Sequence, residues 1–303
     1  MSDSDHPTAN RDVDTGIRQG RWCWPSNRGV ARPGTVQDPA VAEAHGLEAA
    51  TVAGAVHVEQ FVPLLLEQFG DAWWHRGDIS VHWVSTTVEG EPVRCYLQPV
   101  DGDTARARVW MNAEGESLVL EGSAALGDDP ESMLERRLAQ VRGAESAGLL
   151  KGVRQGDQTR PMPLRIDGET AEARLPFVTE PVREYRDFQQ DHGNSTPPAV
   201  GLGRVAPPSL VLAAVRIVEE EVAPAVPAPM GAFGGLQLDH VDGPVLCDRD
   251  YLVRGRVEAV TASEHTEILW YRADILDAAD ERPVARVLSM NRLMEPGVVE
   301  PGG

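Results

Sequence analysis

Several short stretches of the sequence place a carboxylate close to a histidine, a combination that general acid–base catalysis often uses, and three of them are candidate sites. His57 and Glu59 stand two residues apart, and Asp191 is followed directly by His192. The third stretch, residues 239–242, reads Asp-His-Val-Asp. Because histidine titrates near neutral pH, each stretch could move a proton to or from a substrate.

Each of these groups also has a purely structural interpretation. His57 has helical spacing from apolar residues, so it can be a hydrogen-bonded core histidine, and Glu59 can point to solvent. Asp191 and His192 can be a solvated pair on a loop, and 239–242 precedes a Gly-Pro turn typical of a strand end. The chain has no P-loop, nucleophile elbow or zinc-protease pattern, and its histidines lack metal-ligand spacing, so we expect no metal.

The elements that must position these residues repeat along the chain. Residues 54–70 show an apolar helical pattern that ends at a glycine, with Pro63 in a first turn or at a kink. A second helical pattern covers 207–221. Strands are expected at 79–84, 93–100, 106–112 and 118–126, and again at 236–239, 251–260, 266–276 and 284–293. A helix followed by long strands, twice, indicates an internal duplication with α+β character.

Three segments resemble the double-hotdog members of the MaoC-like family, which includes (R)-specific enoyl-CoA hydratases and related acyl dehydratases. Residues 38–46 with 52–54 resemble the segment that leads into the hotdog helix, and 188–197 resemble the catalytic loop. Residues 204–209 resemble the start of the helix that follows. The resemblance implies a double hotdog, in which two long central helices are each wrapped by an antiparallel sheet within one chain.

The expected domain organisation follows from this resemblance and from the repeat. Residues 1–35 are a polar tail and lead-in, 36–127 the N-terminal hotdog, 128–175 a helix and linker, and 176–303 the C-terminal hotdog with a short tail. The two units are expected to pair as an intramolecular dimer, and a homodimer of whole chains is a further expectation.

The hydratase loop of the family has the form G-D-x-N-P-x-H, in which the acid and the histidine flank a water molecule. In the second unit Asn194 stands at the acid position and Ala199 at the histidine position. In the first unit the same positions hold Ala31 and Val36. Neither unit therefore has the dyad in register.

Three interpretations of this departure stay open. Asp191 and His192 can supply a displaced acid–base pair, with Asn194 beside them in the loop. A thioesterase-type site can use Glu59, with His57 as a further catalytic candidate. The third interpretation is a hotdog that binds an acyl ligand without turnover, or a subunit that needs a partner.

The resemblance implies hydratase or dehydratase chemistry on an acyl thioester or a related β-hydroxycarbonyl compound. Biosynthetic isomerisation or cyclisation in the same pocket is an alternative. No cofactor is expected, although coenzyme A could carry the substrate. Candidate substrate-binding residues are Ser209, whose hydroxyl could meet a thioester carbonyl or cap its helix, Gly54 and Arg204.

The composition limits the classes of molecule that the protein is expected to bind. The chain has 303 residues with 28 basic and 47 acidic side chains, a formal charge of −19. Such a surface repels nucleic acid, anionic lipid and acidic carrier proteins, so a small-molecule substrate is expected. Three scattered cysteines, no long apolar run and no signal-peptide pattern predict a cytoplasmic setting.

Overall fold

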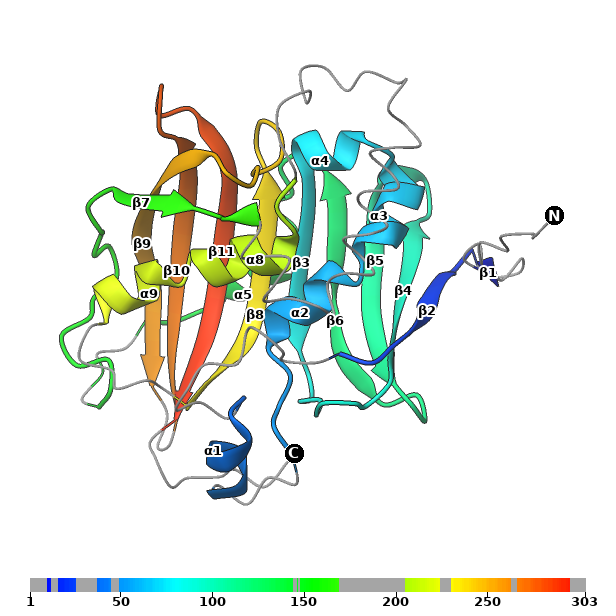
Figure 1. The fold of residues 1–303 in the computed structure, drawn as a ribbon, viewed down its shortest axis with the longest axis horizontal. Coiled ribbons are helices and arrows are strands. Elements are labelled where there is room, and N and C mark those ends of the chain that lie inside the picture. Colours follow the sequence, from blue (N-terminus) through cyan, green and yellow to red (C-terminus); the bar gives the residue numbers. More distant parts are fainter. Residues whose placement is uncertain are drawn as a thin grey trace.

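The structure is a computed structural model of the chain. It describes residues 10–11, 16–25, 37–44, 49–143, 146, 148–168, 205–223, 230–262 and 266–294. Its main feature is one sheet of eleven strands in the order β1-β2-β4-β5-β6-β3-β8-β11-β10-β9-β7 (Figure 1). Every neighbouring pair in that order is antiparallel.

The sheet consists of two units of similar construction. The first contains β1 (Asn10–Arg11), β2 (Arg18–Cys23), α1 (Pro39–Ala44), α2 (Gly54–Glu59), α3 (Val62–Phe69), α4 (Ala72–Arg76), β3 (Gly77–Trp83), β4 (Val93–Val100), β5 (Asp103–Ala113) and β6 (Leu118–Leu126). The connection holds α5 (Met133–Ala139) and β7 (Met162–Arg165). The second contains α8 (Pro208–Ala214), α9 (Ile217–Val222), β8 (Met230–His240), β9 (Asp250–Ala262), β10 (Thr266–Asp277) and β11 (Pro283–Met294).

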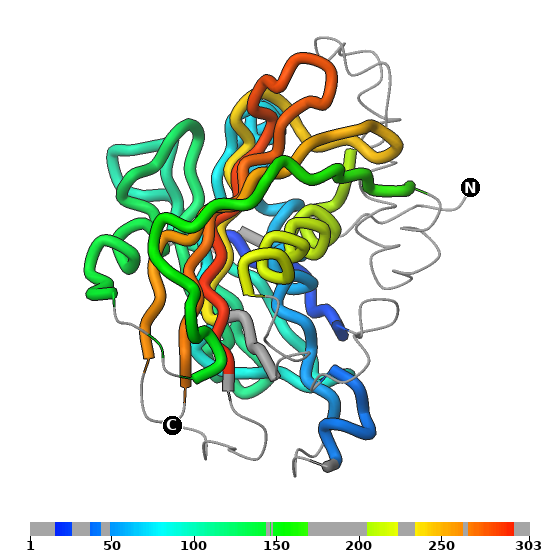
Figure 2. The backbone as a smooth tube through the Cα atoms, turned by 90° about the vertical axis from the view of Figure 1, so that its left-hand side faces the viewer, coloured from blue at the N-terminus to red at the C-terminus, as the bar shows by residue number. Residues whose placement is uncertain are grey.

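Strands β3 and β8 join the units at the centre of the sheet, where Ser80 pairs with Gln237. Helices α2, α3, α8 and α9 cross one face of the sheet (Figure 1). We call this the inner face. Helix α5 lies on the opposite, outer face, as the view along the sheet shows (Figure 2). It is held there by the Leu134 N–H, which donates to Ser80 Oγ at 2.9 Å.

Backbone contacts confirm the duplication. Thr51 bridges to Val88 in the first unit, and Val205 bridges to Leu246 in the second. These bridges immediately precede the central helices, so residues 154 positions apart are equivalent from Thr51 and Val205 through the two helices. The arrangement is the expected double hotdog.

The central helices differ from the expected continuous helices, because each is broken. α2 ends at Glu59 and α3 starts at Val62, while α8 ends at Ala214 and α9 starts at Ile217. Pro63 lies in the first turn of α3, as expected. Since Ile217 occupies the equivalent position in the second unit, proline does not explain the break.

The core lies between the inner face and these helices. Because side chains alternate along a strand, Ile79 and Val81 of β3 point into this core. They are fully buried, as are Phe61, Leu65 and Trp73 from the helical segments. The strands expected from alternation are present with small changes at their ends, except that the strand expected at 236–239 begins six residues earlier, as β8 (Met230–His240). Three pairings involve segments expected to be irregular. In the expected tail, β2 pairs with β1 and with β4, and in the expected linker β7 pairs with β9.

Candidate functional site

The candidate site lies where the central helices of the two units meet. Glu59 is the last residue of α2, and only 2% of it is exposed. The hydroxyl of Ser209, in the first turn of α8, donates a hydrogen bond to Glu59 Oε2. Glu59 Oε1 is buried and has no hydrogen-bond partner among the described residues. The solvent-pointing interpretation of Glu59 is therefore wrong.

Burial sets the charge of this carboxyl group. Desolvation raises the pKa of Glu59 to about 8, although hydrogen bonds from the Ser209 hydroxyl and backbone N–H favour the charged form and oppose the rise. The group is thus mainly protonated at neutral pH. Because Ser209 occupies Oε2 as a donor, the acidic proton resides on the unpartnered Oε1.

His57 supports the helix rather than presenting a free nitrogen. Its Nε2 lies 2.8 Å from Thr87 Oγ1, and Gln60 Nε2 lies 3.4 Å from its Nδ1. Because an amide nitrogen only donates, Nδ1 accepts and Nε2 donates to Thr87. Burial lowers the pKa of His57 to about 4, so the ring is neutral. These contacts fit the core-histidine interpretation.

Helix α2 is buried on every side, which explains how it positions the site. All six residues Gly54–Glu59 are buried, and Gly54 begins the helix after Ala53. Thr87 belongs to the loop before β4, and its carbonyl accepts the N–H of Val52. This anchoring role of Thr87 was not anticipated from the sequence, where the residue stands outside any recognisable pattern.

The remaining candidates are separated or undescribed. Asp239 and His240 are consecutive in β8 and so point to opposite faces, which removes the expected compact cluster. His240 packs edge-on against Trp73 with 4.9 Å between ring centroids, and burial lowers its pKa to about 3. Asp191, His192, Asn194 and Arg204 lie outside the described residues, so their roles stay predictions.

The described residues offer neither a metal-ligand cluster nor a membrane-spanning helix. They contain no group of three or more His, Cys, Asp or Glu residues that could hold a metal ion. Among these same parts of the chain, no helix has the length and apolarity needed to cross a membrane.

Comparisons with known proteins place the fold. No protein-family model matches the sequence, and no curated protein matches it. Among solved structures, a MaoC domain protein dehydratase from Chloroflexus aurantiacus is similar with a TM-score of 0.62, 11% identity and coverage of 98% of this chain and 100% of that one.

Two mycobacterial structures are similar over nearly the whole chain. The double-hotdog protein Rv0216 of Mycobacterium tuberculosis has a TM-score of 0.60 and 13% identity, with coverage of 95% of this chain and 98% of that one. The dehydratase domain of PpsC from the same organism, in complex with C12:1-CoA, has a TM-score of 0.50 and 11% identity, covering 95% and 97%. The chain therefore has the double-hotdog fold of MaoC-like dehydratases.

Proposed function

We propose that this protein is a hydratase or dehydratase that acts on a β-hydroxyacyl thioester, or its enoyl counterpart, carried on coenzyme A. The observation that carries the proposal is the buried Glu59 carboxyl group, which has one oxygen held from the other unit and one oxygen without a partner. The dehydratases among its structural neighbours, one of them with a bound acyl-CoA, support the same substrate class.

In dehydration, the electron pair of the α-carbon–hydrogen bond would form the carbon–carbon double bond as the β-carbon–oxygen bond breaks. Glu59 would donate its Oε1 proton to the departing β-hydroxyl, which leaves as water, and the resulting carboxylate would take the α-proton, so that the carboxyl group is regenerated. Ser209 would stabilise the transient carboxylate through its hydroxyl hydrogen bond. Hydration runs the same steps in reverse.

The protonated state of Glu59 favours this chemistry over thioester hydrolysis. A hydrolase would need Glu59 ionised, as a nucleophile or as the base that activates water. With a pKa of about 8, most of the group is protonated at pH 7 and suited to donate a proton.

The test is hydration of crotonyl-CoA and of trans-2-dodecenoyl-CoA, followed by loss of enoyl-thioester absorbance. Glu59→Gln is expected to reduce kcat/KM at least about 1000-fold, because an amide cannot cycle a proton. Glu67→Gln is the matched control, since Glu67 of α3 is partly exposed and its carboxylate forms an ion pair with Arg18 of β2. It should retain wild-type activity.

Three outcomes would contradict the proposal. Full hydration by Glu59→Gln would remove Glu59 from the chemistry. Release of free thiol from acyl-CoA without hydration would favour the hydrolase instead. If activity is lost in Asp191→Asn and in His192→Ala but is kept in Glu59→Gln, the chemistry belongs to the Asp191–His192 pair.

A further inference from the structure

A second polar cluster lies on the outer face of the sheet, away from Glu59. It consists of His82 in β3, Arg137 in the last turn of α5 and Arg292 in β11. Arg292 Nη2 lies 3.4 Å from His82 Nε2. Because guanidinium only donates, Nε2 accepts and the His82 proton resides on Nδ1.

Two donors in this cluster have no partner. His82 is 7% exposed, and its Nδ1 finds no hydrogen-bond partner among the described residues. The Nε of Arg137 is likewise buried and unpartnered within the same set. Unsatisfied buried donors cost free energy, and charged donors cost more. A ligand with acceptor oxygens would remove this cost.

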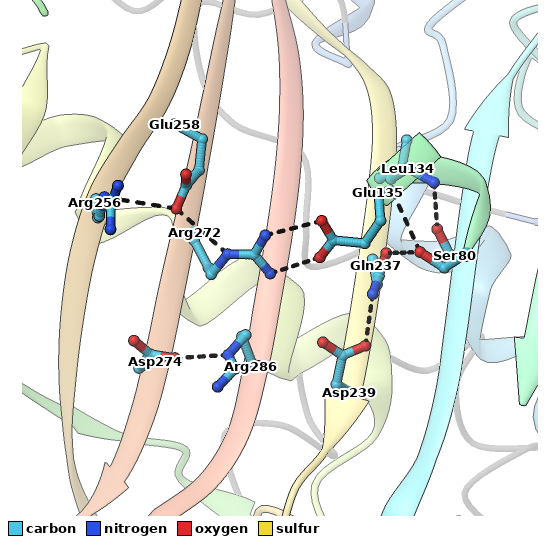
Figure 3. A network of polar contacts seen from close by, with 11 residues as sticks. Ser80, Leu134, Glu135, Gln237, Asp239, Arg256, Glu258, Arg272, Asp274 and Arg286 are labelled. Atoms are coloured by element: carbon cyan, nitrogen blue, oxygen red, sulfur yellow. Dashed lines mark hydrogen bonds and ion pairs between the residues drawn. The ribbon is translucent and has the colours of Figure 1, made fainter. Parts of the chain in front are cut away.

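Two arginines on the outer face of the second unit are paired with acids, as Figure 3 shows. Arg272 donates to both oxygens of Glu135 at 2.8 and 3.1 Å, and Arg286 donates to Asp274 at 3.0 Å. No ion pair is found for Arg137 or Arg292 within the described part of the chain. In a protein with a formal charge of −19, two neighbouring unpaired guanidinium groups are unexpected.

The nearest acid by strand register does not neutralise the cluster. Glu121 is the β6 partner of His82, but its Oε2 faces Arg108 at 3.7 Å. Burial, followed by the positive charges of Arg137 and Arg292, lowers the pKa of His82 to about 4, and no carboxylate of the described residues forms an ion pair with either arginine. The partial negative charge at the C-terminus of α5 favours an arginine at position 137. It does not account for the positions of His82 and Arg292.

We propose that His82, Arg137 and Arg292 form a binding site for an oxyanion, either a phosphate group or a carboxylate group. Both arginines can donate two parallel hydrogen bonds to such a group, and His82 Nδ1–H can donate a third interaction. The site spans β3 of the first unit, β11 of the second and α5 between them. A bound anion would therefore hold the connection against the seam of the two units.

The experiment measures the melting temperature and calorimetric binding of the full chain with inorganic phosphate, acetate and chloride at equal ionic strength. Phosphate or acetate should raise the melting temperature by about 2 °C or more at saturation, and chloride should not. A phosphate-specific shift would assign a phosphate ligand, and an equal acetate shift would assign a carboxylate.

The variant Arg137→Gln/Arg292→Gln should lose the shift and bind the anion at least about 10-fold more weakly. Without anion it should be at least as stable as the wild type, because an uncompensated charge pair is removed. Arg286→Gln is the matched control and should keep the shift. Equal wild-type shifts with all three salts, or a full shift in the double variant, would overturn the proposal. Each single variant provides the same comparison if the double variant does not fold.

Discussion

The central helices of the two units occupy equivalent places but carry different chemistry. Glu59 of the first unit is buried, whereas its equivalent in the second unit, Ala213, is exposed. Ser209 of the second unit donates to Glu59, and its equivalent in the first unit, Ala55, has no side-chain donor. Among the described residues, the carboxyl–hydroxyl pair is therefore formed by Glu59 and Ser209 and not by their equivalents. Each unit therefore supplies a different part of a single site.

The units also differ beneath their helices. Leu65 of the first unit is fully buried among apolar side chains, while its equivalent, Glu219, is buried and accepts a 2.6 Å hydrogen bond from Asn291. Arg216 lies 3.5 Å from the same carboxylate. The second unit thus places a buried polar network where the first has apolar packing, although the two backbones are equivalent.

The largest expected effect concerns the stability cost of Glu59. Its pKa is raised in the folded state from 4.5 to about 8, so folding becomes less favourable as pH rises between those values. The wild type should lose about 3 kcal/mol between pH 5 and pH 7 relative to Glu59→Gln. Urea unfolding of both proteins at the two pH values measures this, with Ala213→Gln as the control. Parallel pH dependence of wild type and Glu59→Gln would show that the carboxyl is not buried.

Ser209→Ala tests the contact between the units. Losing a hydrogen bond that favours the carboxylate should raise the pKa of Glu59 further and move the alkaline limb of the pH–activity profile upward. We expect kcat to fall about 10-fold at pH 7, the equivalent of one hydrogen bond of about 1.4 kcal/mol. Ser289→Ala removes another buried serine hydroxyl, one bonded to Asn291, and should leave the profile in place. An unmoved profile in Ser209→Ala would leave Ser209 a structural role only.

The fold could be predicted from the sequence to a large extent, because alternation and helical spacing are local signals. Residues 93–100 and 118–126 were expected as strands and form β4 and β6 with those same bounds. A first turn or a kink at Pro63 was expected in the first helix, but the break in the second helix was not predicted, since its apolar pattern runs on through residues 215–216. The spacing of apolar residues along a helix indicates which face is buried, but it does not indicate where the helix axis changes direction.

The site could be predicted only in part. Glu59 and Ser209 were each singled out, but as a general carboxylate and a ligand or cap residue, and 150 residues separate them. Whether Glu59 points to solvent or inward depends on α8 packing against α2, which no local pattern encodes. The one available signal was a histidine and a glutamate in an otherwise apolar six-residue helix, which indicates burial on all sides.

Glu219→Leu transfers the first unit's residue into the second. It leaves the Asn291 amide and the Arg216 guanidinium without their acceptor, so we expect a loss of about 1–3 kcal/mol in unfolding free energy. The double variant Glu219→Leu/Asn291→Leu should recover part of this loss, because the buried Asn291 amide is removed together with its acceptor while Arg216 is unchanged. Urea unfolding and a double-mutant cycle provide the measurement. A neutral single variant would show that the network contributes nothing to stability.

The smallest expected effect is that of Ala213→Glu, which transfers the first unit's carboxylate to the equivalent place. Ala213 is exposed, so the new carboxylate stays hydrated, keeps an ordinary pKa and changes the unfolding free energy by less than about 0.5 kcal/mol. Activity should also be unchanged. Ala55 has no hydroxyl that could donate to the new carboxylate, and the exposed position does not desolvate it, so it stays ionised. Increased activity, or a pH-dependent loss of stability like that expected for Glu59, would mean that the second unit retains a working site. The distinction between the units would then lie in residue identity alone, and not in the burial that surrounds Glu59.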